Sequence, residues 1–317
     1  MSAAVLPAFV ALIAAISLLI SPRANNDGAF FRGLAPNGNQ PSLLMLTFSQ
    51  VTTWIFARSL MNAAILGFYY GIWGTLAYAA YYFSFLTGAR IIDCIRFKHG
   101  YLSVQDFLRS RFGLTGTACY NFVIGIRLIS EVFANLLVIG ILFGAVGGEA
   151  YVTAILAFSI VTLLYSVLGG LHASLRTDLF QMAVFIIVLV MLLATTITSS
   201  QFTFASLVGT GFDITEPGPI LLVVALLQIW SYPMHDPVMM DRGFLADRKT
   251  TLRSFYHAAW ISIICIIAFG TLGVFAGEMK LSGEDMNGAL IRLLGDIPML
   301  IFSAALIISA MSTLDST

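Results

Sequence analysis

Hydroxyl side chains interrupt a strongly apolar segment near residue 310 and offer the clearest chemistry in this sequence. Ser309, Ser312 and Thr313 follow the apolar stretch 298–308. A dehydrated small cation takes oxygen ligands, and hydroxyl and carbonyl oxygens supply them without burying several full charges. The alternative is that these hydroxyls hydrogen-bond to backbone carbonyls one turn earlier, as serine and threonine often do in helices. The surrounding sequence favours the cation site.

The composition indicates the class of protein that carries these hydroxyls. Of the 317 residues, 59% are hydrophobic and only 10% are charged, whereas soluble domains carry about 25% charge. We therefore predict an all-α polytopic membrane protein in a lipid bilayer. A formal net charge of zero gives no sign of a nucleic-acid partner. The three cysteines lack metal-ligand spacing, and no phosphate loop or nucleophile–base pair occurs, so we expect neither a cofactor nor an enzyme.

Nine apolar runs are long enough to cross a membrane, for which a helix needs about 20 residues. The runs are 3–21, 42–68, 72–89, 117–146, 151–169, 175–198, 218–240, 255–276 and 297–317. Arginine and lysine concentrate in the 90–116 and 241–253 loops, which lie on one side of this topology. The positive-inside rule then places the N-terminus outside and predicts an integral protein of the bacterial inner membrane. No basic residues precede the first run, so we expect a retained helix rather than a signal peptide.

Two of these runs are interrupted at membrane depth. The second carries the polar stretch 49–53, and the seventh carries two prolines, a histidine and an aspartate within 230–237. Paired broken helices in corresponding positions of two halves point to an inverted-repeat secondary transporter with its binding sites at the breaks. The alternative is a pair of kinked helices satisfied by neighbours and water. We favour the transporter.

The basic loop 90–116 contains signals for a short helix. Ser103 is a suitable N-cap, and Asp106 is favourable in the first turn. Gly113 is a suitable C-terminal residue for this helix. We interpret the segment as structural.

Three motifs link the sequence to a known family. They are YSVLGGLHASLRTDLFQ at 165–181, MSTLDS at 311–316 and RFG at 111–113. They resemble motifs of the sodium:solute symporter family, which includes proline, pantothenate and sugar symporters. The resemblance implies a LeuT-like core of two inverted five-helix repeats after one extra helix. On this basis residues 1–317 form a single transmembrane transporter domain.

The resemblance also divides that domain. Residues 1–21 would be the extra N-terminal helix, 42–198 the first five-helix repeat and 218–317 part of the second. The family continues with further core helices, so we expect a C-terminally truncated chain. Half of the second repeat would then lie beyond residue 317.

The family further implies a sodium ion between the second and last apolar runs. Its ligands would be the hydroxyls of Ser312 and Thr313 and the backbone carbonyls of Phe48, Val51 and Ser309. The ion would couple transport to the sodium gradient.

Asp178 follows Arg176 and Thr177 at the start of the 175–198 run. It is either an acidic first-turn residue favoured by the helix dipole or, as the family implies, a carboxylate tied to sodium coupling or release. Intramembrane carboxylates are costly and usually serve a pathway, so we favour the coupling role.

Further candidates follow from spacing. Gln50, Trp54, Arg58 and Asn62 are four residues apart and share a helical face, as do Arg127, Glu131 and Asn135. Buried charges in lipid are normally paired, so we favour a structural ion pair of Glu131 with Arg127 or Arg58. A sharper hypothesis is that Arg58 binds a substrate carboxylate bidentately. With the aromatic residues of the second break, the candidate substrate-binding residues are Gln50, Trp54, Arg58, Glu131, Trp230 and Tyr232.

Taken together, these patterns predict a sodium-coupled symporter that imports a small organic solute by alternating access. Two alternatives stay open. A proton-coupled transporter on the same scaffold would use Asp178, His235 or Glu131, and a membrane sensor would pass solute binding to a signalling domain beyond residue 317.

Overall fold

Every regular element of the described residues is helical. The computed structural model describes residues 5–24, 27–35, 37–208 and 211–316, and the side chains of Tyr165, Ser206 and Val208 lie outside this description. The elements are α1 (Val5–Ile20), α2 (Asp27–Arg32), α3 (Leu43–Trp54), α4 (Ala57–Ala80), η1 (Tyr81–Phe83), α5 (Ser84–Ile92), η2 (Asp93–Lys98), α6 (Val104–Phe143), α7 (Glu149–Ile197), α8 (Phe204–Val208), α9 (Pro217–Gln228), η3 (Tyr232–His235), α10 (Pro237–Arg242), α11 (Arg248–Glu278), α12 (Met286–Leu294) and α13 (Asp296–Ser316).

Five helical stretches in the described part are long and apolar enough to cross a membrane. They are Ala57–Lys98, Val104–Phe143, Ser166–Ile197, Arg248–Glu278 and Asp296–Ser316, with shorter apolar helices at Val5–Ile20, Glu149–Leu164 and Pro217–Gln228. Each of the nine predicted runs overlaps one or more of these helices or α3.

Glycines separate several of the predicted runs. Gly71 and Gly170 have φ of 59° and 57° and interrupt α4 and α7 where successive runs were expected to meet. Only glycine adopts such angles at little cost. The predicted short helix is confirmed, because the Ser103 hydroxyl accepts a hydrogen bond from the Asp106 amide at 2.9 Å. Gly113, with φ of 66°, ends it within α6.

The first helix break lies later than predicted. The polar residues 49–53 are helical and form the C-terminal part of α3, which ends at Trp54. Ile55 and Phe56 then connect α3 to α4 in a non-helical conformation. The expectation of a break at 49–53 was wrong because a polar side chain can hydrogen-bond to the preceding turn without interrupting the helix. Thr52, for example, donates its hydroxyl to the Phe48 carbonyl at 2.8 Å.

The second predicted break is confirmed. Helix α9 ends at Gln228, a short 3₁₀ turn follows at Tyr232–His235, and α10 begins at Pro237. Asp236 has extended backbone angles and caps α10 by accepting a hydrogen bond from the Met239 amide at 2.9 Å. The prolines at 233 and 237 lack the amide hydrogens that a continuous helix would need.

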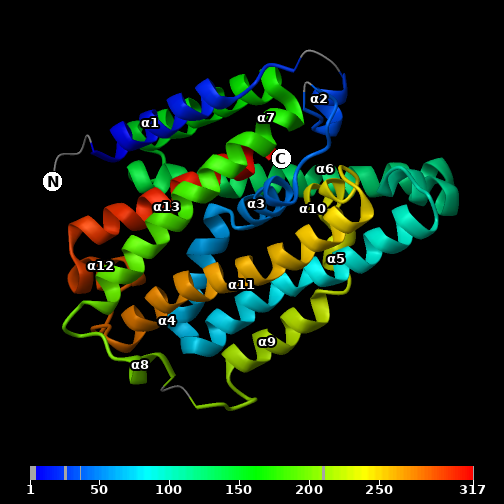
Figure 1. Cartoon of the computed structure of the whole chain (residues 1–317). Coiled ribbons are helices and arrows are strands. Elements are labelled where there is room, and N and C mark those ends of the chain that lie inside the picture. The colour runs from blue at the N-terminus through cyan, green and yellow to red at the C-terminus, as the bar shows by residue number, and fades with distance from the viewer. Residues whose placement is uncertain (1–4, 25–26, 36, 209–210, 317) are drawn as a thin grey trace.

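Helix α13 runs through the middle of the bundle. It contacts α1, α3, α4, α6, α7 and α12, and its final turn lies near the centre of the molecule beside α3 and α7 (Figure 1). Residues 304–313 are all buried. The hydroxyl-bearing end of α13 is therefore enclosed by other helices.

Helices α4 and α11 lie side by side (Figure 1) and approach closely through glycines. A methyl group on Gly273 would collide with the carbonyl oxygen of Ala64, and one on Gly277 with that of Phe68. Small residues at such interfaces let helix backbones pack together in membranes.

Replacing Gly273 with alanine is expected to lower the melting temperature, because the added methyl forces the two backbones apart. Overpacking of this kind costs about 1–3 kcal/mol. The matched control is Gly125→Ala on α6, where an added methyl meets no atom within 4 Å. Thermal unfolding in detergent measures both variants, and equal melting temperatures would contradict the packing argument.

Candidate ion and solute sites

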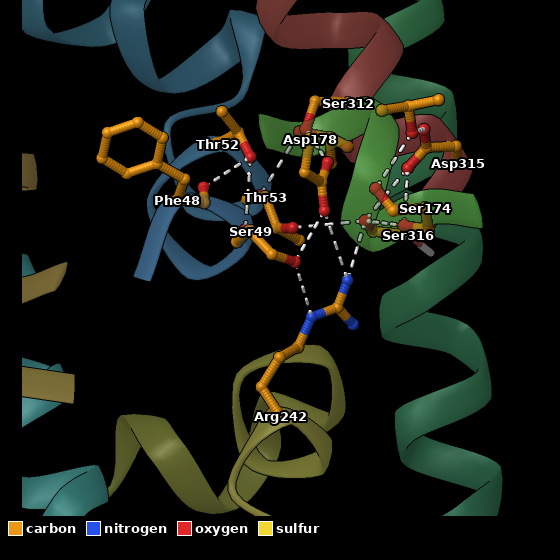
Figure 2. A network of polar contacts seen from close by, with 12 residues as sticks. Phe48, Ser49, Thr52, Thr53, Ser174, Asp178, Arg242, Ser312, Asp315 and Ser316 are labelled. Atoms are coloured by element: carbon orange, nitrogen blue, oxygen red, sulfur yellow. Dashed lines mark hydrogen bonds and ion pairs between the residues drawn. The ribbon is translucent and has the colours of Figure 1, made fainter. Parts of the chain in front are cut away.

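A fully buried carboxylate lies where four helices converge. Asp178 of α7 is 0% exposed. It accepts hydrogen bonds from the hydroxyls of Ser49 on α3 at 2.6 Å and Ser312 on α13 at 2.5 Å. The guanidinium of Arg242, at the end of α10, lies 3.9 Å from it. Figure 2 shows Asp178 between Ser312 and Arg242. The predicted coupling residue thus joins all four helices.

A second carboxylate extends this network along α13. Asp315 accepts hydrogen bonds from Ser174 at 3.0 Å and Thr177 at 2.9 Å, both on α7. Ser316 donates to Asp315 at 3.1 Å and accepts a hydrogen bond from Arg242 at 2.9 Å. Among the described residues, the network therefore holds two carboxylates and one guanidinium.

The α13 hydroxyls predicted to bind sodium have different partners. Thr313 donates to the Ser309 carbonyl one turn earlier at 3.1 Å, which is the local alternative considered from the sequence. Its hydroxyl also lies 3.3 Å from the Thr53 carbonyl of α3. Ser312 instead donates to Asp178. Among the described residues, the buried Ser309 hydroxyl has no hydrogen-bond partner. The end of α13 thus meets α3 through its hydroxyl-bearing face.

The α3 carbonyls predicted as sodium ligands accept hydrogen bonds within their own segment. The Phe48 carbonyl accepts from Thr52 at 2.8 Å, and the Val51 carbonyl accepts from the Ile55 amide at 2.8 Å. A carbonyl oxygen has two lone pairs, so the Val51 carbonyl retains one for a further partner. The Phe48 carbonyl lies inside α3, where it also accepts the helical amide four residues on. Both carbonyls belong to the helix that Thr313 contacts.

A cavity of about 300 Å³ opens where α3 ends. This volume is near the lower limit of about 300–1,000 Å³ for small-molecule sites. It lies at both helix breaks, because its lining comes from the α3–α4 junction, from η1 and its surroundings, and from the α9–η3 segment. The lining residues are Trp54, Phe56, Arg58, Ser59, Asn62, Tyr78, Tyr81, Tyr82, Gln228 and Tyr232.

Hydrogen bonds and ring contacts fix the walls of this cavity. The Tyr82 hydroxyl donates to the Trp54 carbonyl at 2.9 Å, and the Tyr78 hydroxyl donates to Ser59 at 3.1 Å. The Trp54 and Tyr232 rings meet edge to face with centroids 5.0 Å apart. Such contacts hold aromatic side chains in defined orientations.

Only some of the candidate solute-binding residues line the cavity. Trp54, Arg58 and Tyr232 line the cavity. Gln50 is buried within α3, and neither of its amide atoms has a partner among the described residues. Trp230 is 72% exposed and lies outside the lining, as does Glu131. Gln50, Trp54, Arg58 and Asn62 do not share one helical face as expected, because the break at Ile55–Phe56 separates the first two from the last two.

Arg127 holds the second broken helix against α6. Its Nη2 lies 2.6 Å from Asp236 and 3.6 Å from Glu131, and its guanidinium lies 5.1 Å from the Tyr232 ring centroid. Asp236 also accepts a hydrogen bond from the Trp54 indole at 2.9 Å. The predicted ion pair of Glu131 is confirmed with Arg127 and not with Arg58.

A second cavity of about 730 Å³ borders the Asp178 network. Arg242 and Ser316 line it, together with Arg32 and Arg96. Thr53, which donates to Ser316 at 3.2 Å, directly precedes Trp54 of the first cavity. The polar network therefore extends from the lining of the second cavity to a residue adjacent in sequence to the lining of the first.

Several contributors to these sites, among them Ser49, Arg242 and Asp236, were not assigned a role from the sequence. Ser49 has no distinguishing signal beyond its polarity within an apolar run. Arg242 was counted among the loop charges, although its side chain is 4% exposed. Asp236 was ambiguous, and its position directly before Pro237 was the available sign of an N-cap.

The fold is similar to that of a solved membrane transporter. That structure is a Na+-coupled sialic acid symporter in a substrate-bound outward-open state, described as revealing a novel Na+ site. The TM-score is 0.76 with 18% sequence identity, over 99% of this chain and 71% of that one. No family model matches the sequence, and no curated protein matches it. The chain therefore has the all-α fold of a sodium symporter and, with its apolar helices, is an integral membrane protein.

Proposed function

We propose that this chain is a sodium-coupled symporter that moves a small organic solute across the membrane by alternating access. The observation that carries the proposal is the buried Asp178 network. Its hydrogen bonds link α3 to α13 beside a cavity that lies at two helix breaks. Likeness to a sodium symporter fold supports the same function. A LeuT-like arrangement of inverted repeats, with breaks in corresponding helices, accounts for the position of the cavity.

In this proposal sodium binds between α3 and α13. The carbonyls of Phe48, Val51 and Ser309 and the hydroxyls of Ser312 and Thr313 supply oxygen ligands, which hard cations prefer. A serine or threonine hydroxyl rotates freely and accepts as well as donates, so both hydroxyls can turn their lone pairs to the ion. The Asp178 carboxylate beside this interface, which hydrogen-bonds Ser312, favours a cation there.

Coupling follows from the continuity of α3. Sodium bound to its carbonyls stabilises the last turn of the helix, and that turn ends at Trp54 in the solute cavity. An ion that binds one set of conformations better shifts the population toward them. By the positive-inside rule, the arginine-lined cavity at Arg242 faces the cytoplasm, and the Asp178–Arg242 contact closes the path between the two cavities.

Removing both α13 hydroxyls tests the ion site. The Ser312→Ala/Thr313→Ala variant is expected to lose sodium affinity by roughly 10- to 100-fold or more, since even indirect partners of a metal contribute that much. Equilibrium binding of radiolabelled sodium to the purified chain measures this. Ser303→Ala on the same helix is the control, because that hydroxyl donates to the Met299 carbonyl away from the site. If the unmodified chain does not bind sodium and its uptake is driven by protons, the coupling ion is a proton and not sodium.

A further inference from the structure

The lining of the solute cavity carries a positive charge. Among the described residues that line it, Arg58 is the one charged side chain, and no carboxylate lines the cavity. The guanidinium carries a permanent positive charge and five N–H donors. A cationic solute would meet repulsion here without a compensating carboxylate, whereas an anionic solute would find a partner.

The charged groups near the cavity leave Arg58 available. Asp236 and Glu131 are the neighbouring carboxylates, and both pair with Arg127, at 2.6 Å and 3.6 Å. Within the described residues, Arg58 forms no ion pair within 4.0 Å. The short ion pair that competed with a substrate role for Arg58 is therefore formed by Arg127, while Glu131 stays within electrostatic range of Arg58.

The start of α4 adds a second attraction for an anion. Phe56 is the N-cap residue of α4, and its side chain makes no capping hydrogen bond. Phe56, Arg58 and Ser59 all line the cavity, so the beginning of this helix opens onto it. The first amides of a helix carry partial positive charge and bind anions. The backbone and the Arg58 side chain thus favour the same ligand charge.

We propose that the solute is a small carboxylate whose acid group binds Arg58 at the start of α4. The body of the solute would then lie against the aromatic walls of Trp54, Tyr81 and Tyr232, which suit a compact apolar or hydroxylated group. The cavity volume of about 300 Å³ restricts the solute to a small molecule. This inference names the substrate class of the proposed symporter and rests on that function.

Pairs of acids and their amides test the inference, because each pair has nearly one shape and differs in charge. The probes are lactate and lactamide, gluconate and gluconamide, and nicotinate and nicotinamide. Binding to the purified chain in saturating sodium is followed by tryptophan fluorescence, since Trp54 lies in the cavity, and by thermal shift. We expect at least one acid to bind saturably and its amide to bind about 10-fold or more weakly.

The Arg58→Gln variant is expected to remove this preference, with a loss of about 10- to 100-fold in affinity for the acid. Arg58→Lys should keep part of it, because lysine retains the charge without the bidentate geometry. Arg111→Gln, an exposed arginine outside the cavity, is the matched control. Binding confined to amides, acid binding unchanged in Arg58→Gln, or no acid binding would each overturn the proposal. Sodium binding without any solute is measured separately, so failure of the proposed function is distinguishable from failure of this inference.

Discussion

Replacing Asp178 with asparagine is expected to abolish measurable sodium binding and to lower the melting temperature. The carboxylate is fully buried, accepts hydrogen bonds from Ser49 and Ser312, and faces Arg242 at 3.9 Å. Asparagine has nearly the same shape but lacks the charge that favours a cation. Removing one partner of a buried ion pair typically costs about 3–5 kcal/mol, because the remaining charge is left uncompensated.

A double variant separates the two effects. Adding Arg242→Gln to Asp178→Asn removes the uncompensated guanidinium, so we expect much of the melting temperature to return while sodium binding stays absent. Thermal unfolding and radiolabelled sodium binding are measured on the same preparations. Full sodium affinity in the stabilised double variant would show that Asp178 is structural. If the losses of Asp178→Asn and of Arg242→Gln, each measured alone, simply add in the double variant, the two side chains do not interact energetically.

Hydropathy and motif spacing predicted much of the fold. Apolar runs located the spanning segments. In the structure Gly71 and Gly170, with positive φ, lie at boundaries between successive runs, because positive φ is a local property of the residue. The second break followed from Pro233 and Pro237 for the same local reason. The first break was misplaced because polarity alone does not interrupt a helix when hydroxyls can bond to carbonyls of the preceding turn.

The side-chain network depends on tertiary contacts that no local pattern reveals. Ser49 and Asp178 are 129 residues apart, and Arg242 reaches both. Nothing in the spacing of Arg242 separates a buried guanidinium from a solvated loop charge. Spacing did identify Arg127 and Glu131, because residues four apart on one helix are neighbours whatever the fold. Their third partner, Asp236, lies in the distant break before α10 and required the structure.

The second large effect is expected at Arg127. The Arg127→Gln variant leaves the carboxylates of Asp236 and Glu131 buried, with side-chain exposures of 4% and 10%, and removes the cation paired with both. We expect a loss of about 3–5 kcal/mol in the free energy of unfolding. Solute binding should weaken as well, because Asp236 holds the Trp54 indole at 2.9 Å in the cavity wall. Thermal unfolding and fluorescence binding measure the two consequences.

The charge argument at Arg127 makes a further distinction. If the loss arises from uncompensated carboxylates, adding Glu131→Gln to Arg127→Gln should restore part of the stability by removing one of them. Lysine at position 127 should retain more stability than glutamine, because it keeps the charge but not the planar fork that reaches two acceptors. A double variant no more stable than Arg127→Gln would attribute the loss to packing on Tyr232, which the guanidinium approaches at 5.1 Å. Recovery of stability without recovery of solute binding would instead show that Arg127 positions the cavity wall as well as neutralising charge.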